Sequence, residues 1–166
     1  PTVATGININ RVEIWVTNKT GNTNNTRNII ALTDLGENAR VSNPLWATTG
    51  QNVPSNSANS EYSSMVNQYA AARDIDQTST VLDGIAGFVG GVDYEKLESA
   101  RLLSSSEYTV NSALGYVSLK TSIQTDQVLA VAYEYTYGGV TYQVGEFASD
   151  ITDVSQALFV KSLKNT

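Results

Sequence analysis

This 166-residue sequence contains no cysteine and no histidine. Without cysteine there are no disulfides, thiolate metal sites or cysteine nucleophiles. Without histidine there is no Ser-His-Asp triad, and nearly all transition-metal sites are excluded. We therefore expect a protein that is not an enzyme and that carries no metal and no cofactor.

Basic residues and long apolar runs are also scarce. Ten Lys and Arg against sixteen Asp and Glu give a net charge of −6, and the basic residues are scattered, which excludes a nucleic-acid surface. No apolar run approaches the roughly 18 residues that a membrane-spanning helix needs.

The length of the sequence, with 41% hydrophobic residues, predicts one domain over 1–166. No leader precedes the first strand-like segment, and we interpret the chain as a soluble domain excised from a longer polypeptide.

The strongest periodicity lies between residues 128 and 144. Bulky side chains alternate with smaller ones there, which predicts a strand that turns at Gly138-Gly139 into a second strand. A two-residue turn places Tyr137 opposite Val140 and Tyr135 opposite Tyr142. We expect the tyrosine face to be buried in the core. Two short strands upstream, at 107–111 and 116–120, would complete a C-terminal β-meander.

The remaining segments predict a β-rich α+β fold. Strands are expected at 7–17 and 28–34, paired with each other; the phase of the first requires a β-bulge near Asn10-Arg11 or burial of both faces. A long loop follows at 35–56. Residues 59–73 carry an apolar stripe of helical period, and 78–85 would form a short second helix. The segments 94–102 and 156–164 fit a strand or a helix, and we favour strands. The expected architecture is an antiparallel sheet with a C-terminal β-meander and one main helix packed on it.

Candidate chemical sites are weak. The oxygen spacing at 74–78 resembles a calcium loop, but Ser79 and Ile85 stand where glycine and glutamate are needed. The glycines between 84 and 91 lack the lysine of a phosphate loop. The carboxylate pairs at 95 and 98 and at 150 and 153 are interpreted as solvated acidic surface. The tyrosine row could stack on carbohydrate, although its register favours a core-facing role.

Two loops are the candidate contact regions, because loops on a rigid scaffold often carry function. The first spans 18–28 and is crowded with asparagine, threonine and glycine, with Asn22 and Asn24 near its tip. The second, 35–56, contains Trp46, which we interpret chiefly as a core anchor and alternatively as an aromatic ligand platform. Trp46, Asn22 and Asn24 are the predicted partner contacts.

Three groups of segments resemble a known family. They are Ile-Asn-Arg-Val-Glu-Ile-Trp-Val-Thr-Asn at 9–18; Thr-Arg-Asn-Ile-Ile-Ala at 26–31 with Asp-Leu-Gly-Glu at 34–37; and Ala-Arg-Leu-Leu at 100–103 through Glu-Tyr-Thr-Val-Asn at 107–111, Leu-Gly-Tyr-Val-Ser-Leu at 114–119, Gln-Val-Leu-Ala-Val-Ala-Tyr at 127–133 and Gly-Glu-Phe at 145–147. Together they resemble the SprA/Sov family of very large Bacteroidetes outer-membrane proteins.

The resemblance implies a role in gliding motility and type IX secretion, where this family forms the outer-membrane translocon. The chain would then be one non-enzymatic structural domain at the outer membrane or cell surface, which shapes the pore assembly or contacts other secretion subunits and cargo protein. The segment itself would not span the membrane, and the family brings no catalytic residues. The alternative is a cell-surface carbohydrate-binding or adhesion module that uses exposed aromatic side chains.

Overall fold

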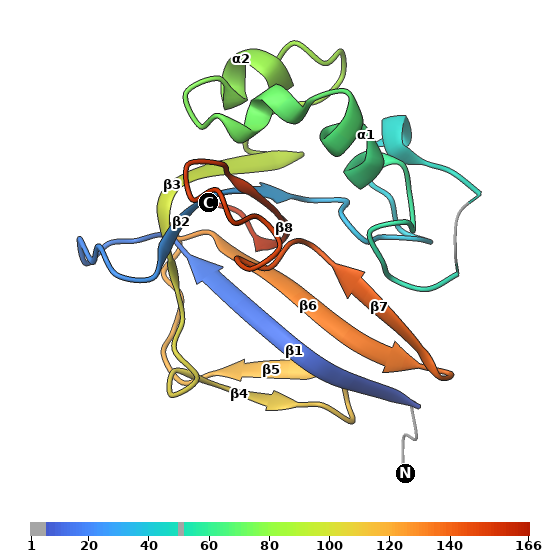
Figure 1. The fold of residues 1–166 in the computed structure, drawn as a ribbon, viewed down its shortest axis with the longest axis vertical. Helices are drawn as coiled ribbons and strands as arrows, with labels where there is room; N and C mark the ends of the chain where they lie inside the picture. Colours follow the sequence, from blue (N-terminus) through green and yellow to red (C-terminus); the bar gives the residue numbers. More distant parts are fainter. Residues whose placement is uncertain (1–5, 50–51) are drawn as a thin grey trace.

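The computed structural model describes residues 6–49 and 52–166, and most of its regular structure is β (Figure 1). Eight strands occur in this part of the chain: β1 Ile7–Val16, β2 Thr26–Leu32, β3 Tyr94–Leu102, β4 Tyr108–Asn111, β5 Tyr116–Leu119, β6 Leu129–Tyr137, β7 Val140–Val144 and β8 Leu158–Lys164. The helices are short: α1 Glu61–Asn67, α2 Thr78–Leu82, and the 3-10 turns η1 Pro44–Trp46 and η2 Ala70–Arg73.

Five strands close into a barrel. The sheet order is β1-β3-β2-β8-β6, and an additional pairing of β1 with β6 closes the ring, while β7 extends the sheet outward from β6. Closure removes the free edges that an open sheet would expose. The sheet is not wholly antiparallel as expected, because β2 and β8 run parallel.

The barrel interior is filled by side chains from all five barrel strands. Trp15, Ile29, Leu97, Ala130 and Leu158 are among the buried residues of this cluster, which Phe147 also joins. A ring of five strands is narrow, so bulky side chains from some strands require small ones opposite. The small residues of this cluster are Ala31 of β2, Ala100 of β3, and Ala130 and Ala132 of β6.

The hairpin of β6 and β7 has the predicted register. Tyr137 lies opposite Val140 and Tyr135 opposite Tyr142, and both turn glycines have positive φ, as a type I′ turn requires. The predicted burial of the tyrosine face holds only in part: Tyr135 is 4% exposed, but Tyr137 is 43% exposed, and the face does not line the barrel interior. Ala130 and Ala132 point into the barrel with no exposed surface, so the tyrosines of the alternate face lie outside it. Because Trp15, Ile29, Leu97 and Leu158 already occupy the interior, the smaller face of β6 is the one that packs there.

The first strand also behaves as its phase predicted. Its register against β6 shifts between Ile9 and Arg11, which is the β-bulge expected near Asn10. Trp15 faces inward, and Ile14 and Val16 face outward. The predicted pairing of the first two strands is wrong: β2 pairs with β3 and β8, and β1 pairs with β3 and β6.

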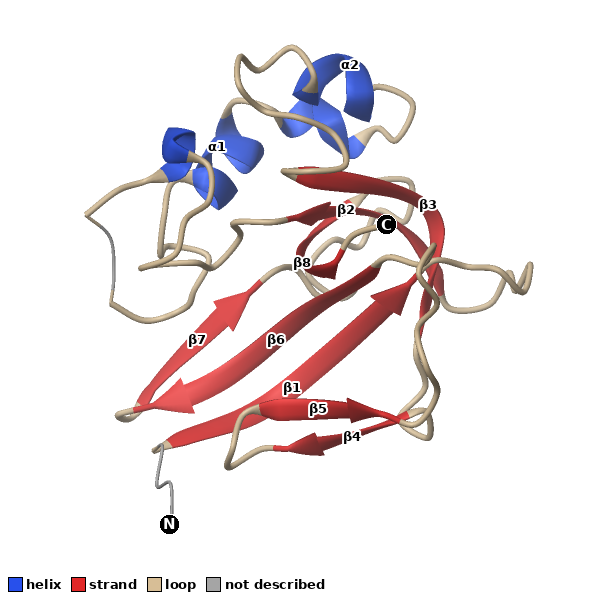
Figure 2. Cartoon of the chain, turned by 180° about the vertical axis from the view of Figure 1, so that it is seen from behind, coloured by secondary structure: helices blue, strands red, loops and turns tan. Residues whose placement is uncertain are grey.

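The predicted C-terminal meander is two separate hairpins. Strands β4 and β5 exist and pair with each other, but they form their own two-stranded sheet. The segment between β5 and β6 carries the chain away, and β6 pairs with β1 instead. The small sheet lies beside β1 in both views (Figures 1 and 2) and packs through Tyr108, Val117 and Leu119 on Ile14 and Val16.

The expected main helix is absent from the described residues, which corrects the α+β class to a mainly β fold. The stripe at 59–73 does face the core, but α1 ends at Asn67 and η2 follows as a separate turn. A helix of seven residues is too short to be stable alone. Tyr69 has φ −116° and ψ 25°, outside the helical range. The short helices cover the outer face of β2 and β8, where they pack on Ile30 and Phe159 (Figure 2).

Other predicted elements are confirmed in part. Of the segment 78–85, residues Thr78–Leu82 form α2, and Gln77 is the N-cap residue. The segments 94–102 and 156–164 are strands β3 and β8. Within the described ranges, no helix is long and apolar enough to cross a membrane.

Candidate functional site

An apolar groove of about 740 Å³ lies on the outer face of β1 and β6. Its floor comprises Ile7 and Ile9 from β1 and Tyr133, Tyr135 and Tyr137 from β6. The bulge at Asn10 allows Val12 to join the two isoleucines on the same side of β1. The tyrosines of β6 that lie outside the barrel interior are thus the residues that line the groove.

Two loops form the walls of the groove. On one side are Leu114 and Gly115 from the β4–β5 turn, with Val117 from β5. This turn is held in place because the backbone N–H of Ile9 donates to the carbonyl of Ser112 at 3.2 Å. On the other side lie Val53 and Pro54.

The second wall is fastened to the hairpin. The hydroxyl of Tyr135 donates to the carbonyl of Pro54. Asn56 binds the end of β7 three times: its backbone N–H donates to Gln143 O at 2.8 Å, its Oδ1 accepts from Gly145 N at 2.7 Å, and its Nδ2 donates to Gly145 O at 3.3 Å. Because both walls are hydrogen-bonded to the floor, the groove is preformed.

The groove carries no charge. None of its described lining residues is Asp, Glu, Lys or Arg. Burial raises the pKa of Tyr133 and of Tyr135, which favours their neutral form. Their rings form a continuous surface: the centroids of Tyr133 and Tyr135 are 6.0 Å apart, and Tyr142 stacks on Tyr135 at 5.4 Å. Tyr137 is 43% exposed at the open end.

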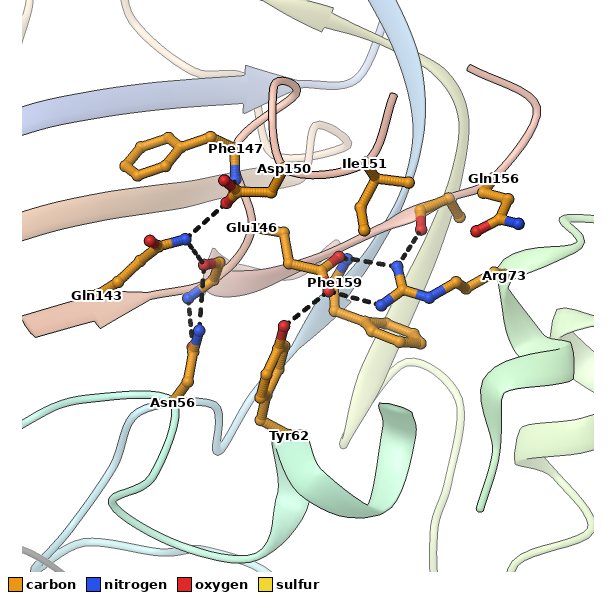
Figure 3. Close-up of polar contacts among 12 residues, drawn as sticks. Asn56, Tyr62, Arg73, Gln143, Glu146, Phe147, Asp150, Ile151, Gln156 and Phe159 are labelled. Atoms are coloured by element: carbon orange, nitrogen blue, oxygen red, sulfur yellow. Dashed lines mark hydrogen bonds and ion pairs between the residues drawn. The ribbon is translucent and has the colours of Figure 1, made fainter. Parts of the chain in front are cut away.

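A buried ion pair attaches the helical segment to the barrel (Figure 3). Arg73 binds Glu146 through two hydrogen bonds, Nη1 to Oε2 at 2.8 Å and Nη2 to Oε1 at 2.6 Å. Tyr62 donates to the same carboxylate at 2.9 Å, as does the backbone N–H of Phe159. Arg73 also lies 4.1 Å above the Phe159 ring. Every oxygen of Glu146 is thus paired, which is typical of a structural clamp.

Glu61, by contrast, is buried without a partner. It has no exposed surface, and neither carboxylate oxygen has a hydrogen-bond partner among the described residues. Burial, followed by the nearby Asp34 carboxylate, raises the pKa of Glu61 well above 4.5, and Asp93 adds to the shift while Lys161 opposes it. This shift favours the protonated form of the Glu61 side chain in the core.

The predicted contact residues do not come together. Trp46 is buried, 4% exposed, and packs edge-on against Phe88 with ring centroids 5.4 Å apart, so it anchors its loop in the core. Asn22 and Asn24 are exposed in the loop between β1 and β2. None of the three lines the groove. Their contact with a partner remains a prediction.

The weak chemical candidates stay apart from one another. No group of three or more His, Cys, Asp or Glu side chains that could hold a metal ion occurs in residues 6–49 and 52–166. In the calcium-like segment, Asp74 Oδ1 instead accepts a hydrogen bond from the backbone N–H of Asp76 at 3.1 Å. Asp150 accepts from Gln143 and from the backbone N–H of Phe147, which makes it a turn residue.

Sequence reasoning missed the groove because its residues are remote in the chain. Val53 and Leu114 have no pattern that links them to β6. One signal was available in the sequence. Residues 128–132 are apolar on both faces of the predicted strand, and only one of these faces could pack inside the barrel.

Comparison with known proteins gives no assignment. The sequence matches no model of a known protein family and no curated protein.

Proposed function

We propose that this chain is a non-enzymatic domain of an outer-membrane protein-secretion translocon of the SprA/Sov type, and that it binds other polypeptides of that machinery in its groove. The partners would be other secretion subunits or cargo protein. The observation that carries the proposal is the uncharged, preformed groove of about 740 Å³ lined by aliphatic and tyrosine side chains. Exposed apolar surfaces of this kind mark interaction sites, because they are costly to leave in water.

The resemblance to the SprA/Sov family supports the same role. The segments that carry it coincide with β1, β2, β6 and the β4–β5 hairpin, and so include three of the five barrel strands and the strands β1, β5 and β6 that contribute to the groove. The helical segment between Glu61 and Leu82 is outside the resemblance.

The groove edge offers positions where an interaction can be tested without disturbing the core. Leu114 is 48% exposed and Leu163 is 57% exposed, and both line the groove. We expect Leu114→Asp and Leu163→Asp, introduced into the parent protein in a bacterium with type IX secretion, to reduce cargo secretion and co-purification of secretion subunits. The introduced aspartate would lose its hydration when the partner binds, and it would then be buried without an opposite charge, which weakens binding.

The matched control is Val154→Asp, because Val154 is 72% exposed and does not line the groove. This variant should secrete normally. Normal secretion by both groove variants, with all three proteins present at equal levels in the cell envelope, would contradict the proposal.

A second candidate is a carbohydrate-binding or adhesion module. The observation that favours it is the row of tyrosines along the groove, since aromatic rings stack on sugars. Sugar sites also require several convergent hydrogen-bonding groups, and here the Tyr135 hydroxyl is already bound to Pro54. A glycan array probed with the chain separates the two: hits that disappear in Tyr137→Ala would favour the module, and their absence would favour the translocon domain.

A further inference from the structure

We propose that the groove receives an extended, uncharged segment of a partner polypeptide, which adds to the free edge of β5 as a third strand of the β4–β5 sheet. This inference rests on the proposed protein-binding function and names the form in which the partner binds. It depends on a strand edge, a groove beside it, and the charge of that groove.

The edge is supplied by β5. Within the described residues β5 pairs only with β4, so the small sheet has two strands and β5 has one edge without a partner strand. An unpaired edge presents a row of backbone N–H and C=O groups that can bind another strand. Natural proteins protect such edges with proline, lysine or bulges. The sequence of β5, Tyr-Val-Ser-Leu, contains none of these, and Lys120 follows only after its end.

The groove lies beside this edge rather than the edge of β4. Its wall includes Val117 of β5 with Leu114 and Gly115 of the preceding turn, and no described residue of β4 lines it. In the ribbon, β5 is drawn between β4 and the strands β1 and β6 (Figures 1 and 2). A strand added to β5 would therefore lie over the tyrosine row of β6.

The tyrosine row of β6 and the strand β5 have comparable lengths. At roughly 3.3 Å per residue, the row from Tyr133 to Tyr137 is about 13 Å long, and the four residues of β5 have a similar length. Such a length accommodates four or five residues of an extended partner. Every second side chain of that partner would point into the groove, as in other cases of strand addition.

The absence of charged side chains in the groove limits which partner segments can bind there. The described lining residues are all uncharged, in a chain whose net charge is −6. The partner side chains that enter must also be uncharged, because a charge would be buried without a counterion. An acyl chain would match the apolar lining but could not use the hydrogen-bonding groups of the β5 edge. A peptide uses both features, and we therefore assign the groove to a peptide.

The test uses the 166-residue chain and an acetylated, amidated seven-residue peptide of alternating valine and threonine, with two lysines at one end for solubility. The control peptide has the same side chains but carries N-methyl groups on alternate backbone amides along one edge. Binding is followed by fluorescence anisotropy, and amide hydrogen exchange locates the bound peptide. We expect the unmodified peptide to bind at least tenfold more tightly than the control.

Bound peptide should slow exchange of the amides at 116–119 by at least tenfold and leave those of β2 unchanged. Leu114→Asp should weaken binding by at least tenfold, whereas Val154→Asp should not. Equal binding of both peptides, binding of neither, or protection at β7 instead of β5 would each overturn the inference. The proposed function fails separately, through normal secretion by the groove variants, so the two failures are distinguishable.

Discussion

Replacement of Glu61 by glutamine should stabilise the protein in a strongly pH-dependent way. Glu61 is fully buried, both of its oxygens lack a described partner, and its pKa in the folded state lies well above 4.5. The folded protein therefore binds one more proton than the unfolded chain between pH 4.5 and the folded-state pKa. Glutamine has nearly the same shape as the protonated carboxyl group but cannot ionise.

The size of the effect follows from this difference in proton binding. For one proton, the free energy of unfolding falls by about 1.4 kcal/mol for each pH unit between the two pKa values. The sign is fixed by the direction of the shift: the protonated carboxyl group is fully compatible with the fold below pH 4.5, and stability is lost as the pH rises toward the folded-state pKa. Glu61→Gln does not incur this loss.

Urea unfolding of both proteins at each pH unit from 4 to 8 measures the difference. The difference should be small at pH 4 and grow by about 1.4 kcal/mol per pH unit until the folded-state pKa is reached. The chain has no histidine, the residue that ordinarily titrates in this range, and all other carboxylates are common to both proteins. A difference that is constant from pH 4 to pH 8 would refute the assignment of Glu61 as a buried neutral acid.

Three further substitutions test the packing of the fold. Arg73→Met leaves the buried carboxylate of Glu146 without its cation and should lower the free energy of unfolding by about 3–5 kcal/mol in urea titrations; a loss below 1 kcal/mol would show that the clamp is unimportant. Ala132→Leu overfills the barrel interior and should cost about 1–3 kcal/mol, seen as a lower thermal midpoint, whereas no change would argue against a closed, filled barrel. Gly36→Ala combines a φ of +79° with a new Cβ 2.7 Å from the side chain of Val144, and should cost about 1–3 kcal/mol by the same melting assay; an unchanged midpoint would contradict the close approach.

The sequence was most informative where neighbours in the chain determine the structure. The register of β6 and β7 follows from a two-residue turn and a period of two, and the bulge in β1 follows from the phase of its apolar residues. These features depend on backbone geometry within about ten residues. The preference for strands over helices at 94–102 and 156–164 is confirmed by β3 and β8.

The helix prediction shows where local patterns become insufficient. The stripe of Tyr62, Met65, Val66 and Tyr69 does pack on the core, as a helical period indicates. Whether seven or fifteen residues continue as one helix depends on tertiary contacts, since short helices are marginal by themselves. Here Arg73 is held by Glu146, 73 residues away in the sequence, and the chain turns before it.

The sequence by itself determined that the protein is rich in strands, that it lacks cysteine and histidine chemistry, and that its tyrosine hairpin turns at Gly138-Gly139. Only the tertiary structure decided which face of that hairpin is inside. The pairing of β1 with β6 closes a ring whose interior also holds Trp15, Ile29, Leu97 and Leu158, so Ala130 and Ala132 face into it and the tyrosines face outward. Whether a side chain fits inside the barrel depends on its volume and on the space that all five strands leave. That space is a property of the whole barrel, so the groove could not be found from any one segment.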